Sequence, residues 1–279
     1  MTRRPIFLLS VLCFGFAFFY IPILSMIVYS FNVSRLATVW GGFSMKWYGV
    51  LFSNGQVLAA LKLSVTIALI SATTATILGT MAGMALTRMG KFKGRTFFSG
   101  MVTAPLIMPD VITGISMLIF FILLGQYLGW PGQRGFATIT LAHITFSMVY
   151  VTTIIQARLS VQDRAIEEAA MDLGSKPWQV LFDITLPVIF PAILSGWLLA
   201  FTISLDDVVI TTFTSGPGYT TLPLLIWSKV KLGVTPDINA LATLIVIVVG
   251  TCVAIAGVVM SRAEKRRNLD MRLAFRANE

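Results

Sequence analysis

The sequence predicts an all-α membrane protein with six transmembrane helices and both termini in the cytoplasm. Hydrophobic residues make up 56% of the 279 residues and charged residues only 12%, against about 25% in soluble domains. The apolar residues also fall into long uncharged runs, and a helix needs about 20 such residues to cross a bilayer. The length therefore allows about six spans with short loops and no large soluble domain.

The first uncharged run covers 5–34 and follows a pair of arginines, Arg3 and Arg4. It is longer than the apolar core of a secretory signal peptide and lacks a clear small-residue cleavage site, so we expect a retained anchor helix. The polar stretch that follows, 31–56, is predicted to be the first external loop. Its aromatic residues suit the interface between lipid and water: Trp40, Trp47 and Tyr48.

The second run, 63–87, contains a glycine pair with three residues between its members. Gly79 and Gly83 favour close helix packing inside a membrane, although such pairs are common there and say nothing about a substrate. The next segment, 88–95, carries four basic residues and no acidic residue. It is therefore predicted to face the cytoplasm.

The third run begins at Thr96, is interrupted at Pro105 and Pro109, and continues to Leu128. Proline lacks a backbone N–H and restricts the residue before it, so a break in this helix is expected. A short external turn follows, and the fourth span is predicted at 135–157.

The fifth and sixth spans are predicted at 184–205 and 238–261. The stretch between them, 208–228, is also uncharged, but the sequence Ser-Gly-Pro-Gly at 215–218 divides it. A loop or a short external helix is therefore expected there instead of a seventh span. The strongly basic tail, 262–279, is predicted to be cytoplasmic.

The distribution of charge agrees with this topology. With both termini inside, 15 of the 21 lysine and arginine residues lie in cytoplasmic segments and 6 in external ones, as the positive-inside rule expects. The same bias places the loop 158–187 in the cytoplasm. The net charge of +9 is thus explained by a membrane, and no nucleic-acid partner is predicted.

The sequence indicates no enzymatic chemistry. It contains no GxxxxGK[ST] phosphate-binding loop, so ATP hydrolysis would have to belong to a partner. A single histidine excludes the usual histidine-based catalytic arrays. Cys13 and Cys252 lie far apart in apolar runs, so neither a disulfide nor a metal site is predicted.

The loop 158–187 carries the signals of a short helix followed by a tight turn. Asp163 suits the N-cap of a helix that presents small alanine side chains, which allow another surface to approach closely. Gly174 can supply the left-handed turn that ends this helix. Lys176 and Pro177 then redirect the chain toward the fifth span.

This loop resembles the EAA loop of ABC-importer permeases, because several residue types recur at the same spacing. In that family the loop forms a coupling helix that docks into a groove on the ATP-hydrolysing subunit. The resemblance implies that Glu168 seats this helix and that Gly174 shapes its exit. The residues that match the pattern, and that are predicted to couple to the ATPase, are Glu168, Ala169, Ala170, Gly174, Ile184, Leu186 and Pro187.

Nearly the whole chain also resembles the smaller permease subunit of polyamine importers, above all the putrescine type. The segments 39–49, 104–118 and 204–244 carry the similarity. It implies the type I ABC-importer permease fold in the bacterial inner membrane. It also implies two ATP-binding subunits, a sister permease subunit and a periplasmic polyamine-binding protein as partners. No cofactor is expected on this chain, since ATP and Mg would lie on the partner ATPase.

Three carboxylates are predicted at membrane depth: Asp110, Asp206 and Asp207. A charge at the centre of a bilayer costs about 2.5–3.5 kcal/mol, so each needs a cation, a partner or water. If the third and fifth spans were straight helices, Asp110 would lie about 22 Å along the helix from Arg95, and Asp206 about 22 Å from Pro191. The two acids would then share one depth in the outer half of the membrane. The acids either attract a cationic substrate or cap helix ends. The nearest basic residues are in the outer loops: Arg134, Lys229 and Lys231.

Two aromatic residues near the outer break, Tyr219 and Trp227, are assigned with the three aspartates to the substrate pathway. His143 in the fourth span has two interpretations, a proton relay or a hydrogen bond to a neighbouring helix. The chain is divided into an N-terminal helix with the first loop, 1–56, a five-helix transmembrane domain, 57–261, and the basic tail.

The predicted function is that of a permease subunit that moves polyamines, with putrescine as the first candidate, by alternating access. One alternative is an ABC permease for spermidine or another solute. The other is a secondary transporter driven by an ion gradient through Asp206 and His143. The secondary-transporter hypothesis leaves the EAA pattern unexplained, and the sequence lacks the inverted repeat that many such carriers show.

Overall fold

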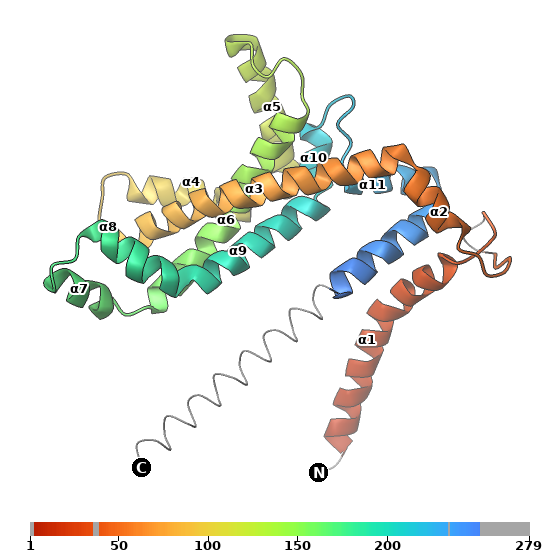
Figure 1. Cartoon of the computed structure of the whole chain (residues 1–279), viewed down its shortest axis with the longest axis horizontal. Helices are drawn as coiled ribbons and strands as arrows, with labels where there is room; N and C mark the ends of the chain where they lie inside the picture. Colours follow the sequence, from red (N-terminus) through yellow and green to blue (C-terminus); the bar gives the residue numbers. More distant parts are fainter. Residues whose placement is uncertain (1–2, 36–38, 234, 252–279) are drawn as a thin grey trace. The chain divides into compact units, whose positions relative to one another are not determined.

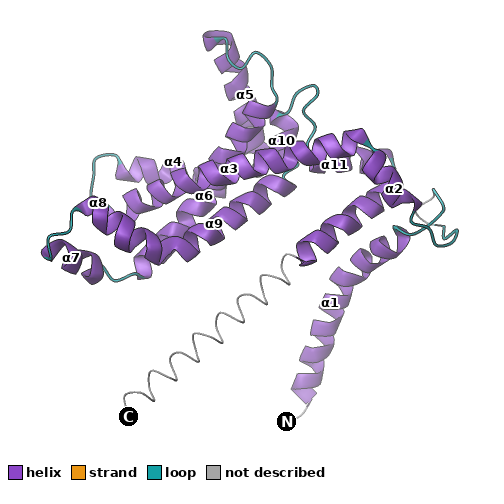
Figure 2. Cartoon of the chain, viewed as in Figure 1, coloured by secondary structure: helices purple, strands orange, loops and turns teal. Residues whose placement is uncertain are grey.

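The computed structural model describes residues 3–35, 39–233 and 235–251. In these ranges the protein consists of helices and loops, with one isolated β-bridge between Asn32 and Phe43 (Figure 2). The prediction of an all-helical chain is therefore confirmed for the described residues. The chain separates into two compact units, 1–55 with 229–279, and 56–228.

Among the described residues, five helical segments are long and apolar enough to cross a membrane. They cover 6–29, 55–88, 110–128, 136–161 and 177–206. Each matches one predicted span. The described part of the sixth predicted span is a shorter apolar helix, Pro236–Thr251; the rest of that span and the basic tail lie outside the described residues.

The first unit contains α1, Arg3–Tyr29, and a loop that carries the short helix α2, Lys46–Ser53. This loop is held around Asn32, whose side-chain amide donates to the carbonyl of Val39 over 2.7 Å and accepts a bond from the amide of Gly41 over 2.8 Å. The helix and these bonds show that the predicted external loop is a small folded element.

One aromatic residue of this loop is not where the sequence predicts it. Trp47 is only 8% exposed, and its indole Nε1 donates to the carbonyl of Asn32 over 2.7 Å. The assignment of Trp47 to the membrane interface is therefore wrong, because the indole packs inside the loop and its N–H finds a backbone partner there. Trp40, by contrast, is 48% exposed.

The second unit is built around three long helices that run side by side (Figure 1). They are α3, Gly55–Arg88, α6, Phe136–Val161, and α9, Leu186–Asp206. Their core is formed by small and branched apolar side chains that are fully buried. Its members are Ala72, Val151, Ile155, Leu159, Ile189 and Ala200.

The glycine pair of α3 allows it to pack closely on α6. A β-carbon on Gly79 would lie 2.8 Å from Cβ of Val151, and one on Gly83 would lie 2.8 Å from Cγ2 of Ile155. Real β-carbons do not approach other atoms so closely, so the contact requires glycine at both positions. The predicted close packing through this pair is confirmed.

The third predicted span is two helices, α4, Arg95–Ile107, and α5, Asp110–Leu128. Met108 between them is extended, with φ −83° and ψ 136°, and Pro109 precedes α5. The two helices point in different directions (Figure 1). The break removes the basis of the depth estimate for Asp110, which begins a span of its own instead of lying far along a straight helix.

After α9 the chain forms two short helices, α10, Val209–Thr214, and α11, Leu222–Leu232. α10 packs against α5 and α6. Neither helix reaches the length of a membrane span. The predicted break at 215–218 is confirmed, and so is the expectation that 208–228 forms no seventh span.

Candidate functional site

The loop between α6 and α9 folds into a short helix with defined ends. The helix α7 covers Ala165–Asp172, and its first amide is bonded over 3.0 Å by a side-chain oxygen of Asp163. Gly174 has φ +90°. The amide of Ser175 bonds to the carbonyl of Ala170 over 3.0 Å, and that of Gly174 to Met171 over 2.9 Å. These bonds form a Schellman turn, as predicted for Gly174.

The chain then returns to the bundle through α8, Pro177–Gln179, and a π-helical segment η1, Val180–Thr185, which continues into α9. Ile184 lies in η1, and Leu186 packs against the buried core of the three long helices. Pro187 lies in the first turn of α9, where a missing N–H costs nothing. The last three residues of the EAA pattern therefore build the re-entry into the bundle.

The two adjacent glutamates of α7 have different surroundings. Glu168, the first residue of the EAA pattern, is exposed, as is Ala169. The Oε1 atom of Glu167 lies 3.2 Å from Nη2 of Arg88 at the end of α3, and it accepts a hydrogen bond from Thr185 over 3.1 Å. Neighbouring residues on a helix point about 100° apart, and here Glu167 points toward Arg88 and Thr185 while Glu168 is exposed.

Glu167 was not singled out by the sequence, although a signal was available. Glu167 directly precedes the EAA pattern on the same short helix, and Arg88 is the basic residue at the end of α3. The loop is tied to α3 a second time, because the guanidinium of Arg164 donates to the carbonyl of Thr87.

At the other end of α9, a buried polar cluster surrounds His143. Its Nδ1 lies 2.7 Å from the hydroxyl of Ser204 on α9, and its Nε2 lies 3.0 Å from the hydroxyl of Thr211 on α10. Nε2 is also 3.3 Å from Oδ2 of Asp207. Both ring nitrogens are therefore engaged, which supports a hydrogen-bonded cross-link between helices over a proton relay.

The network also indicates which ring nitrogen carries the proton. The Thr211 hydroxyl donates to Asp207 over 2.8 Å, so its oxygen is left to accept from His143. A proton on Nε2 satisfies both contacts, because this N–H can donate toward the oxygens of Thr211 and Asp207. This assignment leaves no polar atom of the cluster without a partner.

The structure separates the two adjacent aspartates. Asp207 accepts bonds from the amides of Ile210, over 3.2 Å, and Thr211, over 2.7 Å, and so caps α10. Asp206, the last residue of α9, is exposed in this chain, as is Asp110. Asp207 therefore caps a helix, as one of the two interpretations predicts. Asp110 and Asp206 have exposed carboxylates that a cation can approach.

Two of the outer basic residues have partners other than these acids. Nζ of Lys229 lies 2.9 Å from Oδ2 of Asp237, and Arg134 donates to the carbonyl of Phe213 over 3.0 Å. The ion pairs between permanently charged groups of the described residues are Arg88–Glu167 and Lys229–Asp237, and His143 contacts Asp207. Asp110 and Asp206 are in none of them.

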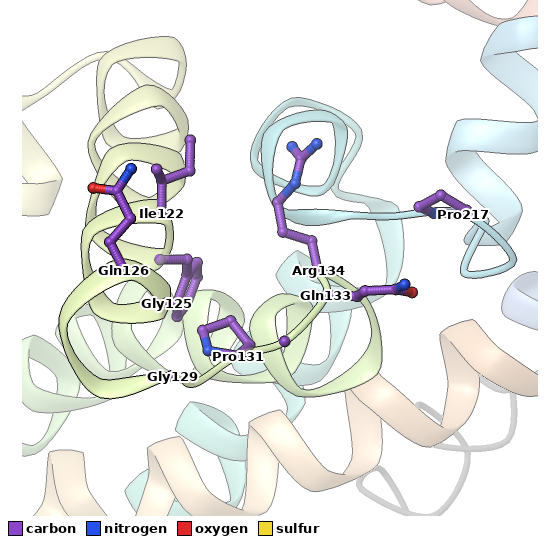
Figure 3. A pocket seen from close by; sticks show the side chains of 10 residues that line it. Ile122, Gly125, Gln126, Gly129, Pro131, Gln133, Arg134 and Pro217 are labelled. Carbon is purple, nitrogen blue, oxygen red and sulfur yellow. The ribbon is translucent and has the colours of Figure 1, made fainter.

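Two pockets open at the loop ends of the second unit. One, of about 540 Å³, lies between the end of α5, which carries Ile122 and Gln126, and the following loop, which carries Arg134 (Figure 3). The other, of about 510 Å³, is lined by Lys62 and Tyr219 among others. Each contains a basic side chain and no carboxylate. Neither pocket, as this chain alone forms it, is suited to a multiply charged cation.

The two predicted aromatic residues, Tyr219 and Trp227, have different surroundings. Tyr219 packs closely on Gly135, at which a β-carbon would lie 2.7 Å from the tyrosine ring. Trp227 on α11 is 50% exposed. Among the described residues, no group of three or more His, Cys, Asp or Glu side chains is placed to hold a metal ion.

Five long apolar helices among the described residues are typical of a multi-pass membrane protein. Residues 75–268 match the family described as "Binding-protein-dependent transport system inner membrane component". The chain belongs to this family. This membership supports the prediction of a transport component and not of an enzyme.

The sequence similarity to two relatives covers most of the chain. It is 55% identical over 276 residues to the putrescine transport system permease protein PotI of Escherichia coli (strain K12), covering 99% of this chain and 98% of the relative. It is 42% identical over 253 residues to the spermidine/putrescine transport system permease protein PotC of the same strain, covering 91% and 93%.

Solved structures support the fold. A chain of a bacterial ABC transporter involved in the import of alginate superposes with a TM-score of 0.74 at 18% identity, covering 93% of this chain and 94% of that one. A chain of the MetNI methionine ABC transporter gives 0.61 at 14% identity, with coverage of 79% and 99%. The predicted fold of an ABC-importer permease is therefore confirmed, and these similarities carry no statement about substrate.

Proposed function

We propose that this chain is the permease subunit of an ATP-driven polyamine importer, with putrescine as the substrate. The observation that supports this most is the 55% identity to PotI over nearly the full length of both chains. The exposed carboxylates Asp110 and Asp206 fit the proposal, because a polyamine carries several positive charges and these acids form no ion pair in the described residues.

The proposed complex contains a sister permease subunit, two ATP-binding subunits and a periplasmic polyamine-binding protein. Asp110, Asp206 and Asp207, with Tyr219 and Trp227, lie along a cation path that is completed by the sister subunit. Asp207 acts there mainly by holding α10 in place. This chain binds no cofactor, and ATP and Mg lie on the partner ATPase.

The proposed topology has six spans in the bacterial inner membrane, with both termini cytoplasmic. The N-terminal part, 1–56, forms an anchor and the first periplasmic loop, the region 57–261 forms the transport domain, and 262–279 is a cytoplasmic tail. The loop 158–187 then faces the ATPase. The residues Glu168, Ala169, Ala170 and Gly174 shape the docked helix, and Ile184, Leu186 and Pro187 anchor its return.

The transport step proposed here is alternating access. ATP binding closes the two ATPase subunits and displaces α7, and the displaced helix moves the bundle from outward to inward access. The polyamine is released from the binding protein into the path and is drawn along it by the exposed carboxylates. Spermidine is the second candidate substrate, because PotC, a spermidine/putrescine permease protein by name, is 42% identical.

Uptake of labelled putrescine and spermidine by cells that express the chain with its partner subunits tests the proposal. Asp206→Asn is compared with Asp183→Asn, an exposed aspartate in the π-helical start of the same continuous helix. We expect loss of putrescine uptake only in Asp206→Asn, with the complex assembled in both. Absence of polyamine uptake by the wild-type complex would refute the proposed substrate.

A further inference from the structure

One carboxylate oxygen of α7 joins three helical segments of the second unit. Oε1 of Glu167 lies 3.2 Å from Nη2 of Arg88, the last residue of α3, and accepts a hydrogen bond over 3.1 Å from the hydroxyl of Thr185, the last residue of η1. We call these three residues the Glu167 cluster. Figure 1 shows α7 beside α8 and the start of α9.

The cluster is largely shielded from water. The side chains of Arg88 and Glu167 are 16% and 13% exposed, and Thr185 is buried. Nε and Nη2 of Arg88 are buried without a hydrogen bond, so Glu167 supplies its counter-charge in the described part of the chain. An arginine stays charged at any physiological pH. The ion pair is thus costly to open, because opening it would leave a buried charge uncompensated.

Both partners of Glu167 lead directly into the packed bundle. Arg88 ends α3, which contacts α6 through Gly79 and Gly83 without room for a β-carbon. Thr185 precedes α9, which shares a fully buried core with α6. Close-packed helices move together more readily than they separate, because their interiors resist compression. A shift of the Glu167 carboxylate therefore reaches α3 and α9 at the same time.

The hydrogen bond between Thr185 and Glu167 starts from an irregular part of the helix, the π-helical segment η1. A π-helical turn interrupts the regular hydrogen-bond ladder of a helix and is frequent at functional positions. The Thr185 hydroxyl, which in a regular helix often bonds to the preceding turn, bonds here to α7 instead. The start of α9 is thus fixed to α7 by a side chain at the point where its own backbone ladder is irregular.

We infer that Glu167 is a positioning residue that transmits displacement of α7 to α3 and α9, whereas the exposed Glu168 faces the ATPase. This inference rests on the proposed function, since it assumes that an ATPase moves α7. The two adjacent glutamates thus have different roles. Glu168 contacts the ATPase, and Glu167 transmits the movement to the bundle. Arg88 and Thr185 are the two receiving residues.

The first test compares four variants of the purified complex in proteoliposomes, with labelled putrescine and ATP hydrolysis measured together. Glu167→Gln keeps the shape and the acceptor for Thr185 but removes the charge. Thr185→Val removes only the link to α9. Arg88→Met with Glu167→Met removes both charges, and Arg88→Glu with Glu167→Arg reverses the pair. Asp183→Asn, which removes an exposed carboxylate of η1, is the matched control.

We expect putrescine moved per ATP hydrolysed to fall by about fivefold or more in Glu167→Gln, with a smaller fall in Thr185→Val. The double methionine variant separates transmission from folding. Removing both charges leaves none unpaired, so the protein assembles, but we expect coupling to stay low. The reversed pair should recover coupling at least in part. Wild-type coupling in Glu167→Gln or in the double methionine variant would overturn the inference.

A second readout needs no substrate. Cys13 and Cys252 are replaced by alanine, and a cysteine is placed at Leu198, which is 52% exposed on α9. Its labelling rate with a maleimide is compared in the complex with and without ATP and vanadate. We expect ATP to change the rate in the wild-type background and not with Glu167→Gln. An equal change in both backgrounds would contradict the inference, even if putrescine proved to be the wrong substrate.

Discussion

His143 on α6 and Asp207 after α9 meet in the interior of the second unit, with Nε2 of the histidine 3.3 Å from Oδ2 of the aspartate. The two residues are 64 positions apart, and Thr211 bonds to both of them. Asp207 also caps α10. The contact therefore holds α6, the end of α9 and α10 together.

This arrangement predicts that substitutions of two neighbouring aspartates, Asp206 and Asp207, differ in their effect on stability. His143→Ala and Asp207→Asn each disturb a buried bonding network, and we expect a loss of about 1–3 kcal/mol in stability. Asp206→Asn changes an exposed group and should leave stability close to wild type. Thermal unfolding of the purified complex, with the amount of inserted protein, measures the difference. Equal effects of Asp206→Asn and Asp207→Asn on stability would contradict the assigned roles.

A second prediction concerns the contact between α3 and α6. Gly83→Ala places a β-carbon 2.8 Å from Ile155, and overpacking of this kind costs about 1–3 kcal/mol. Gly100→Ala in α4 is the control, because nothing lies within 4 Å of its β-carbon; alanine there should be neutral or should stabilise by about 0.5–1 kcal/mol. Melting temperatures of the two variants should move in opposite directions or differ clearly in size.

The turn after α7 provides a third prediction. A β-carbon on Gly174 meets no neighbour, but its φ of +90° strains any residue with a side chain. We expect Gly174→Val to insert normally and to uncouple ATP hydrolysis from uptake. Gly174→Asn should keep more of the coupling, because asparagine tolerates left-handed backbone better than valine. Uptake per ATP hydrolysed is the measurement, and normal coupling in the valine variant would remove the importance assigned to this turn.

A fourth prediction addresses the first loop. Trp47→Phe keeps a large apolar ring but removes the N–H that bonds to the carbonyl of Asn32 over 2.7 Å. Loss of one such buried bond leaves the carbonyl without this donor and should cost about 1–3 kcal/mol. Trp40→Phe, at a ring that is 48% exposed, should cost much less. Limited proteolysis of the loop in both variants compares the local effect.

Local features of this protein were predictable from the sequence. The length of the uncharged runs located the five candidate spans. Gly174 indicated a left-handed helix end, and Gly79 with Gly83 indicated close packing. Each of these properties depends on residues that are near one another in the chain. Backbone geometry and bilayer thickness act at that range, so the pattern itself carries the information.

Which residues contact one another could be learned only from the tertiary structure. Asp206 and Asp207 are adjacent in the sequence, yet only Asp207 meets His143, and of Glu167 and Glu168 only Glu167 meets Arg88. The rotation of α7 decides which of its two glutamates meets Arg88, and the end of α9 at Asp206 turns the extended residue Asp207 toward His143. The break at Pro109 changes the direction of the chain before Asp110. These outcomes depend on packing between segments that are many residues apart. By itself, therefore, the sequence determined the family and the helical layout, and packing decided which acids are structural and which remain exposed.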